Sequence, residues 1–389
     1  METLNNIVLT IQNYMSNYIL VIALLGAGLW FSIRLGFIQV RGFGESMRRT
    51  FGGLFSKKGE AGADGMSSFQ ALATAIAAQV GTGNIAGAAT ALAIGGAGAI
   101  FWMWIAAFLG MATIYAEAIM AQKYKTVGAD GQVTGGPVYY IRAAFKGTFG
   151  KVLAGIFAIL ITLALGFMGN AVQSNSIAAS FHTAFGIPQW IMGLVVAVIA
   201  IFVFMGGMKR IAKVTETIVP FMAALYIIGS LIVIIYNYKN IPYAFASIFI
   251  GAFSPSSVVG GAAGATVKLA LTKGVARGLF SNEAGMGSTP HAHAVAKVDH
   301  PVEQGFVAMT GVFIDTFVVL NLTALVILTT KSIPSGKTGA ELSQYAFSTL
   351  YGKGGDIFVA ICMFFFAFST IIGWYFFGQA NIKYLFGPK

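Results

Sequence analysis

The chain has 389 residues, of which 57% are hydrophobic and only 10% are charged. A soluble domain carries about 25% charged residues and could not bury this much apolar surface, so the composition predicts a polytopic membrane protein. The same composition excludes a disordered chain, a collagen-like repeat and a nucleic-acid module, and the single cysteine excludes a disulfide scaffold. Because a nucleic-acid module is excluded, we interpret the net charge of +11 as an indication of how the chain is oriented in the membrane.

Apolar stretches long enough to cross about 30 Å of hydrocarbon recur along the sequence. Nine crossings are predicted, at residues 16–38, 67–92, 98–121, 150–181, 188–206, 212–236, 266–297 (interrupted), 304–330 and 356–380. The first lacks the cationic start and the cleavage site of a signal peptide, so a retained helix is expected. Residues 243–253 and 340–350 are predicted to form short interfacial helices between later crossings.

Lys and Arg residues gather on alternate connections between the crossings. Six of them lie between Arg34 and Lys58, after the first crossing, and five lie between Lys123 and Lys151, after the third. Connections on the opposite side carry few of the 24 cationic residues. Positively charged loops favour the cytoplasmic side, so the sequence predicts a multi-pass protein of the cell (plasma or inner) membrane with its N-terminus outside.

Two crossings are interrupted by glycine-rich polar sequence. Residues 81–84 read GTGN, and residues 278–290 read GLFSNEAGMGSTP. Unwound backbone inside a membrane is tolerated only where protein buries it or where it lines a cavity. Gly83 and Gly87 also fit a small-xxx-small packing contact, which remains the alternative. A dinucleotide-binding motif is excluded because no strand precedes these glycines.

A pair of interrupted crossings at corresponding places in two halves is typical of inverted-repeat transporters. Breaking a helix frees N–H groups that attract an anion such as a substrate carboxylate. It also frees carbonyl groups that can coordinate Na⁺. The two breaks are therefore predicted to meet halfway through the bilayer and to hold a zwitterion and a cation without charged side chains.

Residues 95–110, GGAGAIFWMWIAAFLG, resemble the signature of the alanine or glycine:cation symporter (sodium:alanine symporter) family. Residues 81–87, 135–140, 281–285 and 373–374 also resemble that family, in its order, and the resemblance covers essentially the whole chain. It implies an all-α polytopic membrane protein with a leucine-transporter-type inverted repeat and one extra N-terminal helix.

The resemblance also implies a division of the chain. Residues 1–66 would form the extra transmembrane helix and a cytoplasmic loop, and residues 67–240 the first five-helix repeat, broken at 81–84. Residues 241–389 would form the second, inverted repeat, broken near 280–288. Such a fold has eleven crossings, so the last two are expected to be missing and the second repeat incomplete.

The family's site residues are implied at matching positions. The substrate carboxylate would be held by Gly81, Thr82, Gly83 and Asn84, with help from Gln173. The ammonium group and side chain would be surrounded by Phe280, Asn282 and Gly285, and the pocket closed by Thr370 and Trp374. Na⁺ would bind the carbonyls of Ala77 and Val80 and the hydroxyls of Ser369 and Thr370.

Three acidic residues fall within predicted crossings, where ionisable groups are costly and suggest function. Glu283 is expected to pair with Arg277 or to accept hydrogen bonds from freed amides, with direct coupling as the alternative. Glu117 is expected to extend toward the membrane interface near Lys123. Asp315 has no partner that the sequence identifies.

The predicted function is sodium-coupled symport of small neutral amino acids, alanine or glycine, into the cell. A proton-coupled symporter and a passive channel or pore are the alternatives. Neither enzymatic activity nor a cofactor is expected, and Na⁺ is the predicted coupling ion. The expected partners are the amino acid, Na⁺ and the lipid bilayer, without nucleic acid or an obligate protein partner. His291 and His293 point to different helix faces, which disfavours a metal site.

Overall fold

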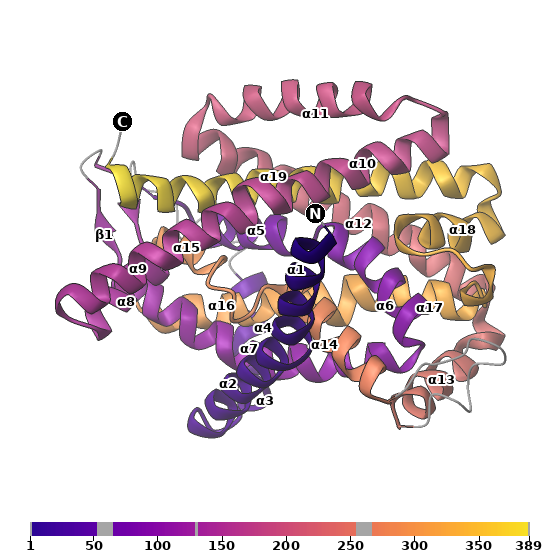
Figure 1. Cartoon of the computed structure of the whole chain (residues 1–389), viewed down its shortest axis with the longest axis horizontal. Helices are drawn as coiled ribbons and strands as arrows, with labels where there is room; N and C mark the ends of the chain where they lie inside the picture. Colours follow the sequence, from indigo (N-terminus) through magenta and orange to yellow (C-terminus); the bar gives the residue numbers. More distant parts are fainter. Residues whose placement is uncertain (1, 53–64, 129–130, 254–266, 388–389) are drawn as a thin grey trace.

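The computed structural model of the chain describes residues 2–52, 65–128, 131–253 and 267–387. Most of these residues are helical (Figure 1). In chain order the α-helices are α1 (Glu2–Tyr14), α2 (Leu20–Arg34), α3 (Ile38–Arg41), α4 (Phe43–Phe51), α5 (Ser68–Gln79), α6 (Ala88–Gly95), α7 (Gly98–Lys123), α8 (Pro137–Ala144), α9 (Gly147–Ile161), α10 (Asn170–Phe185), α11 (Gln189–Phe204), α12 (Gly207–Tyr236), α13 (Ile241–Phe253), α14 (Val267–Asn282), α15 (Pro290–Ala294), α16 (Pro301–Phe313), α17 (Asn321–Thr329), α18 (Gly339–Tyr351) and α19 (Lys353–Phe386).

Shorter elements join these helices. The π-helical segments are η1 (Met15–Ile19), η2 (Gly83–Gly87), η3 (Thr162–Gly169) and η6 (Ile314–Leu320), and the 3₁₀ turns are η4 (Tyr238–Asn240) and η7 (Ile333–Ser335). Strands β1 (Thr126–Val127) and β2 (Val133–Thr134) form an antiparallel hairpin that the all-helical expectation did not include. The hairpin pairs Thr126 with Thr134 and Val127 with Val133.

Five helical stretches of the described chain are long and apolar enough to cross a membrane. They are Gly98–Lys123, Gly147–Phe185, Gly207–Tyr236, Pro301–Thr329 and Lys353–Phe386. Each contains a predicted crossing almost entirely and extends a few residues beyond most of its ends. The apolar helices Leu20–Arg34, Gly83–Gly95 and Gln189–Phe204 are shorter. Length therefore supports five crossings, and the count of nine stays a prediction, because a broken crossing consists of two short helices.

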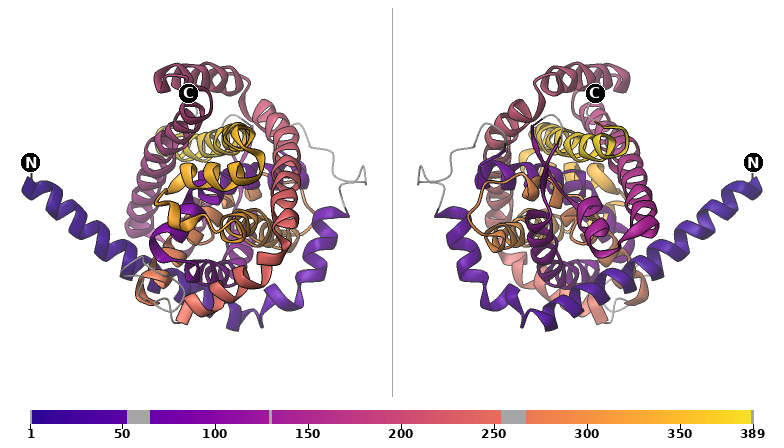
Figure 2. Two further views of the ribbon diagram at one scale, coloured as in Figure 1. Left: turned by 90° about the vertical axis from the view of Figure 1, so that its right-hand side faces the viewer. Right: turned by 90° about the vertical axis from the view of Figure 1, so that its left-hand side faces the viewer.

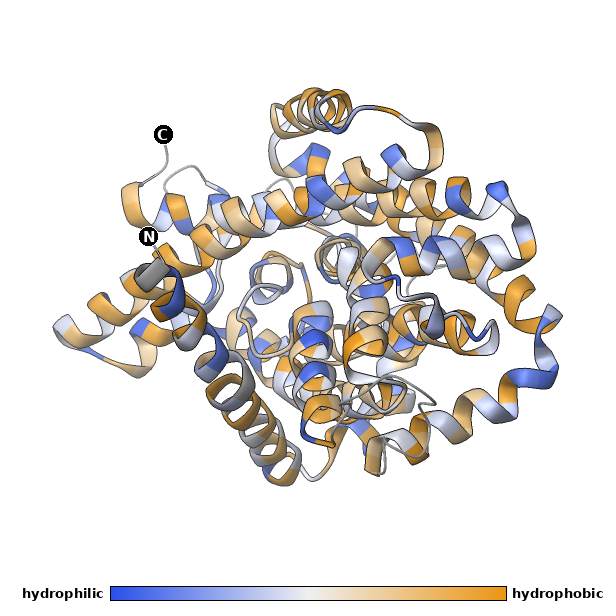
Figure 3. Cartoon of the chain, turned by 45° about the vertical axis from the view of Figure 1, so that its right-hand side comes forward, coloured by the Kyte–Doolittle hydropathy of each residue, from blue (hydrophilic) through white to orange (hydrophobic). Residues whose placement is uncertain are grey.

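The helices divide into an apolar outer layer and a buried interior. The stretch from α9 to α12 exposes large apolar side chains, among them Phe167 of η3 (64%) and Trp190 (72%) and Phe202 (67%) of α11. In Figure 3 the ribbon of α11, at the top of the view, is coloured largely as hydrophobic. Such a surface is expected to face lipid, since a soluble protein would bury it. The interior is formed by α5, α7, α14, α16 and α19, which pack against one another and carry buried polar residues such as Gln79, Asn282 and Thr370.

The N-terminal helix is longer than the predicted crossing at 16–38. Helices α1, η1 and α2 follow one another without a break from Glu2 to Arg34, and Figure 2 shows α1 projecting away from the bundle. The second half packs on α7, where Gly28 lies against Leu109 so closely that a Cβ would be 2.8 Å from the Leu109 Cβ. The predicted short helices are confirmed as α13 and α18.

Candidate functional site

The first break lies between α5 and η2. Ser67 begins α5 with a capping box, in which its side chain and that of Gln70 each accept a backbone N–H. The helix ends at Val80, whose ψ of 84° leaves the helical region. The N–H of Gly81 then donates to the Asn84 side-chain oxygen (3.0 Å), and that of Thr82 to the Gln173 side-chain oxygen (3.1 Å). Two freed backbone donors are thus satisfied by side-chain amides, as a buried helix end requires.

The same break frees a carbonyl oxygen at Ala77. Its helical partner would be the N–H of Gly81, four residues on, which instead donates to Gln79 and Asn84. In place of this partner, the hydroxyl oxygens of Ser369 and Thr370 on α19 lie 3.3 and 2.9 Å from the Ala77 oxygen. Three of the predicted Na⁺ ligands are therefore brought together. The fourth, Val80, is the buried residue at which α5 ends.

The second break separates α14 from α15. Residues 283–289 are non-helical, and Glu283, Gly285 and Gly287 have positive φ values of 58°, 88° and 73°. This conformation costs little for glycine but strains a glutamate, and such strain gathers at functional sites. The Glu283 carboxylate is fully buried and accepts hydrogen bonds from the Trp374 indole N–H (2.5 Å) and the Ser288 hydroxyl (2.5 Å). It therefore bridges the break to α19.

The two breaks lie against each other, as predicted. The Gln79 side-chain N–H donates to the carbonyl oxygen of Asn282 at 2.8 Å. A Cβ on Gly83 would stand 3.0 Å from the Ser281 Cα and 3.1 Å from its Cβ, so the absence of a side chain at Gly83 permits the approach. The packing alternative is also correct for Gly83, but a Cβ on Gly87 would meet nothing closer than 3.8 Å.

Gln173, Thr370 and Trp374 lie around this junction. A Cβ on Gly81 would be 2.3 Å from the Thr370 hydroxyl oxygen and 3.2 Å from the Gln173 side-chain oxygen. The Trp374 ring packs on Gly169 in η3, where a Cβ would be 2.3 Å from the ring. It also meets Phe280 edge-on, with ring centroids 6.2 Å apart. Gln173 of α10 and Thr370 of α19 thus lie against the first break, whereas Trp374 of α19 lies against η3 and α14.

Two of the predicted substrate residues point elsewhere. The Asn282 side chain donates to the Thr316 hydroxyl (3.3 Å) and accepts the N–H of Ala284, so it faces η6. Gly285 lies near α2, where a Cβ would be 2.6 Å from Leu24. Asn282 is the last residue of α14, and Gly285 follows it in the non-helical segment with a positive φ of 88°.

The expectations for the acidic residues also need correction. Glu283 forms no ion pair with Arg277 within the described part of the chain; its partners are Trp374 and Ser288. Glu117 does not extend toward Lys123 but accepts the backbone N–H of Gly285 at 3.2 Å. A buried backbone donor in the unwound segment has thus drawn the carboxylate inward.

Asp315 is the residue that sequence reasoning left unexplained. It lies in η6, and its carboxylate accepts hydrogen bonds from the Asn84 amide (2.7 Å), the Ser281 hydroxyl (3.1 Å) and the Thr316 hydroxyl (2.8 Å). Its backbone oxygen also accepts from the Asn84 amide at 3.0 Å. Asp315 thus joins the first break to the second. The signal that could have found it is an aspartate inside an apolar crossing.

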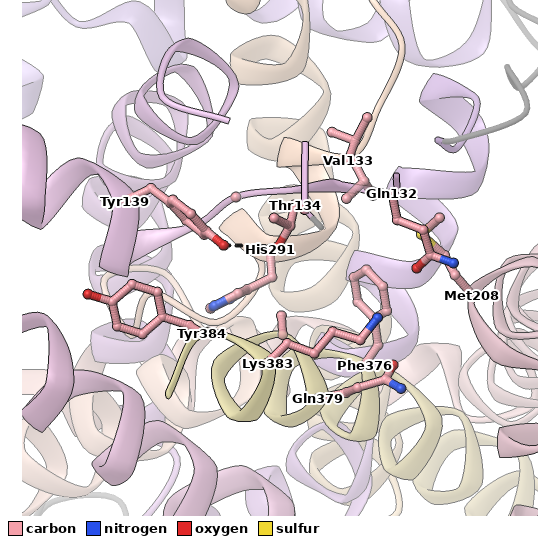
Figure 4. Close-up of a pocket in the computed structure, with 14 residues that line it drawn as sticks. Gln132, Val133, Thr134, Tyr139, Met208, His291, Phe376, Gln379, Lys383 and Tyr384 are labelled. Atoms are coloured by element: carbon pink, nitrogen blue, oxygen red, sulfur yellow. Dashed lines mark hydrogen bonds between the residues drawn. The ribbon is translucent and has the colours of Figure 1, made fainter. Parts of the chain in front are cut away.

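A pocket of about 230 Å³ lies near α15 and the end of α19 (Figure 4). Its lining includes Thr134 of the hairpin, Tyr139, His291 and Lys383. The His291 ring contacts the Ser288 carbonyl oxygen (2.7 Å) and the Asn381 amide (2.9 Å). Since the Ser288 hydroxyl donates to Glu283, the pocket is connected to the second break through a short chain of hydrogen bonds.

The chain is similar to known transport proteins over its whole length. Residues 1–389 match the model of the sodium:alanine symporter family. The sodium/alanine symporter AgcS of Methanococcus maripaludis is 43% identical over 390 residues, which cover 99% of this chain and 84% of that protein. The amino-acid carrier protein AlsT of Bacillus subtilis is 44% identical over 363 residues, covering 93% of this chain and 75% of the relative.

Among solved structures, a manganese transporter of Eremococcus coleocola has a similar fold. The TM-score is 0.57 at 14% sequence identity, with 86% of this chain and 70% of that chain covered. At this identity the likeness concerns the fold alone. Together with the apolar helices, it supports a mostly helical multi-pass membrane protein. The chain is a transporter, not an enzyme, and belongs to the sodium:alanine symporter family.

Proposed function

We propose that the protein is a secondary active transporter that carries a small neutral amino acid, alanine or glycine, into the cell together with Na⁺. The observation that supports this most directly is the junction of the two breaks. It presents backbone N–H groups at Gly81 and Thr82 and an oxygen set at Ala77, Ser369 and Thr370. A zwitterionic substrate and a monovalent cation need these two kinds of group side by side.

The substrate carboxylate would take the place of two side-chain oxygens. The N–H groups of Gly81 and Thr82 now donate to the oxygens of Asn84 and Gln173. A carboxylate offers two acceptor oxygens, so it can replace both when the side chains turn aside, with Gly83 allowing close approach. This exchange keeps every buried donor satisfied, which lowers the cost of binding.

The rest of the substrate would lie between the second break and α19. The carboxylate of Glu283 would face the ammonium group, and Phe280 and Trp374 would limit the size of the side chain. Each methylene group that exceeds the size of the pocket disfavours a substrate by about 1–3 kcal/mol, so the shape of the pocket alone can favour alanine over leucine. Asn282 and Gly285 would act indirectly, by holding the second break against η6 and α2.

Na⁺ would bind at the freed carbonyl of Ala77, with Val80, Ser369 and Thr370. Carbonyl and hydroxyl oxygens are suitable ligands for a hard cation. Because α5 and α19 both contribute, the ion would draw α19 toward the first break. Ordering of the break by Na⁺ would then prepare Gly81 and Thr82 for the substrate, which is the basis of the proposed coupling.

The proposed architecture follows the charge pattern and the two breaks. Residues 1–66 would form an extra helix, with the N-terminus outside, and residues 67–240 and 241–389 two inverted repeats of the leucine-transporter type. The site would lie at the middle of the cell membrane. The pocket at His291 and Lys383 would be the inner end of the substrate path, since it lies among segments assigned to the cytoplasmic side.

Uptake into proteoliposomes tests the function. We expect radiolabelled alanine to accumulate against its gradient when Na⁺ is high outside, with an inward flow of positive charge. A proton-coupled symporter would need a pH gradient instead, and a channel or pore would equilibrate alanine without accumulating it. Either result would refute the proposal.

A further inference from the structure

Helix α14 carries three basic residues that the proposed transport cycle does not use. Lys268, Lys273 and Arg277 all precede the second break, in the half of the crossing that the proposed topology assigns to the outer leaflet. Basic residues normally gather on the cytoplasmic side, and an ionisable residue inside a crossing is costly unless it is paired or functional. These three side chains therefore need a local explanation.

The first of the three, Lys268, has a partner in the N-terminal helix. Its ammonium donates to the Tyr18 hydroxyl at 2.7 Å and lies 5.0 Å from the centre of the Tyr18 ring. No ion pair formed between described residues includes Lys273 or Arg277. Two cations of a membrane crossing thus have no counter-charge in the part of the chain that the structure describes.

Lys273 and Arg277 line a cavity of about 410 Å³ between α14 and the N-terminal helix, which pack against each other through η1 and α2. The N-terminal helix contributes two polar side chains, Gln12 and Ser16. The remaining side chains of the lining are apolar, among them Leu20, Leu24 and Leu279. The cavity therefore joins two cations and two neutral hydrogen-bonding groups to an apolar wall.

The position of the two cations along α14 agrees with the depth of a lipid headgroup. Helix α14 ends at Asn282, nine residues after Lys273, which corresponds to about 13 Å of helix. Half of the hydrocarbon layer is about 15 Å thick, so with the break at the middle of the membrane Lys273 lies near the outer headgroups. Arg277 lies one turn deeper, and its long side chain can extend toward the same level.

We propose that this cavity binds the headgroup phosphate of an anionic phospholipid such as phosphatidylglycerol. Lys273 and Arg277 would supply the positive charge, Gln12 and Ser16 would donate hydrogen bonds, and the acyl chains would lie on the apolar wall. A zwitterionic lipid fits less well, because its own cationic group already balances its phosphate. The inference rests on the proposed orientation of the chain in the membrane and not on the identity of the transported substrate.

The bound lipid would also stabilise one wall of the proposed substrate site. Phe280 belongs to the lining of the cavity and meets the Trp374 ring edge-on, with ring centroids 6.2 Å apart. Trp374 in turn donates to Glu283 in the second break. A lipid in the cavity would therefore hold the end of α14 against α19. Alanine uptake is accordingly expected to be faster in membranes that contain the anionic lipid.

Native mass spectrometry of the purified full chain tests the site directly. The protein is titrated with phosphatidylglycerol, with phosphatidylcholine of the same acyl chains, and with inorganic phosphate as a probe that has no acyl chains. We expect phosphatidylglycerol to bind one saturable site at least about tenfold more tightly than phosphatidylcholine, and inorganic phosphate not to bind at the same concentrations. Equal affinities for the two lipids, or equal affinities for phosphatidylglycerol and inorganic phosphate, would overturn the proposal.

Two single variants locate the binding site, so that the test survives if one of them does not fold. Arg277→Gln and Lys273→Gln each remove one cation, and each should weaken phosphatidylglycerol binding by about fivefold, as expected for one basic residue at an anionic headgroup. The affinity for phosphatidylcholine should not change. The matched control is Lys239→Gln in η4, which is exposed and does not line the cavity. Unchanged phosphatidylglycerol binding in a folded Arg277→Gln or Lys273→Gln variant would refute the site.

Uptake in two kinds of vesicle separates this inference from the proposed function. The initial rate of Na⁺-dependent alanine uptake should be higher in vesicles of phosphatidylcholine with phosphatidylglycerol than in phosphatidylcholine alone, and Arg277→Gln should lose most of this difference. Equal rates in the two kinds of vesicle would refute the effect of the lipid on the substrate site. Absence of Na⁺-dependent uptake in both would refute the proposed function, whereas the lipid-binding measurement does not depend on transport.

Discussion

The hydroxyl of Thr370 offers a direct test of the first cation site, through Thr370→Ala. In the structure this hydroxyl lies 2.9 Å from the Ala77 carbonyl oxygen, and the Ser369 hydroxyl lies 3.3 Å from the same atom. Removing Thr370 therefore leaves the freed carbonyl with a partner, so the fold is expected to survive. The Na⁺, by contrast, loses one of its proposed oxygen ligands.

The size of the effect follows from the contact that is lost. An interaction with a charged group contributes about 1.5–3 kcal/mol, and 1.4 kcal/mol corresponds to a factor of ten in an equilibrium constant. The half-saturating Na⁺ concentration should therefore rise by about 10- to 150-fold. Thr370→Ser keeps the hydroxyl and loses only a methyl group, so it should stay within about threefold of the unaltered protein.

The assay is the initial rate of alanine uptake as a function of Na⁺ concentration, at saturating alanine. The melting temperature of each purified variant controls for folding. Thr370 also contacts the backbone near Gly81, so the KM for alanine is measured at saturating Na⁺ to separate the two roles. Unchanged Na⁺ dependence in correctly folded Thr370→Ala would refute the assignment of this cation site.

Substitutions at three further positions, Asn84, Trp374 and Gly83, test the substrate site and the contact between the two breaks. Asn84→Ala removes the amide that donates to Asp315 and so holds the first break in place, and alanine binding should fall at least about 100-fold at normal expression. Near-normal binding by calorimetry would argue against the site. Trp374→Ala should admit larger amino acids in competition assays, and unaltered selectivity of this variant would assign the tryptophan to packing. Trp374→Phe keeps most of the bulk but leaves Glu283 without its indole donor, so it should weaken alanine binding by about tenfold or more. Gly83→Ala would push the added methyl group against Ser281 and should destabilise the protein by about 1–3 kcal/mol. The control Gly87→Ala, where a Cβ meets nothing closer than 3.8 Å, should not. Equal melting temperatures of the two variants would contradict the close approach of the two breaks at Gly83.

Local sequence determined much of the helical framework. The apolar runs gave the five long helices to within a few residues, and the glycine-rich segments gave both breaks, because helix length and helix interruption depend on neighbouring residues. The small hairpin at Thr126–Thr134 was missed, since two-residue strands leave almost no alternating pattern. The longer N-terminal helix was missed because its first residues are too polar to resemble a crossing.

The site was only partly accessible from sequence. The family resemblance named Gln173 and Thr370, which lie against the first break, and Trp374, which donates to Glu283 in the second break. It did not reveal that Asn282 and Gly285 lie against η6 and α2, because residue type alone does not specify which distant helices pack against a segment.

By itself, then, the amino-acid sequence determined the class of protein, the apolar helices, the two interruptions and the family. Only the tertiary structure decided the partners: Glu283 with Trp374 rather than Arg277, Glu117 with Gly285, and Asp315 between Asn84 and Ser281. The physical reason is that a freed backbone group or a buried carboxylate must be satisfied by whichever group the packing of distant helices brings within about 3 Å. That proximity is a property of the folded bundle and not of any single segment.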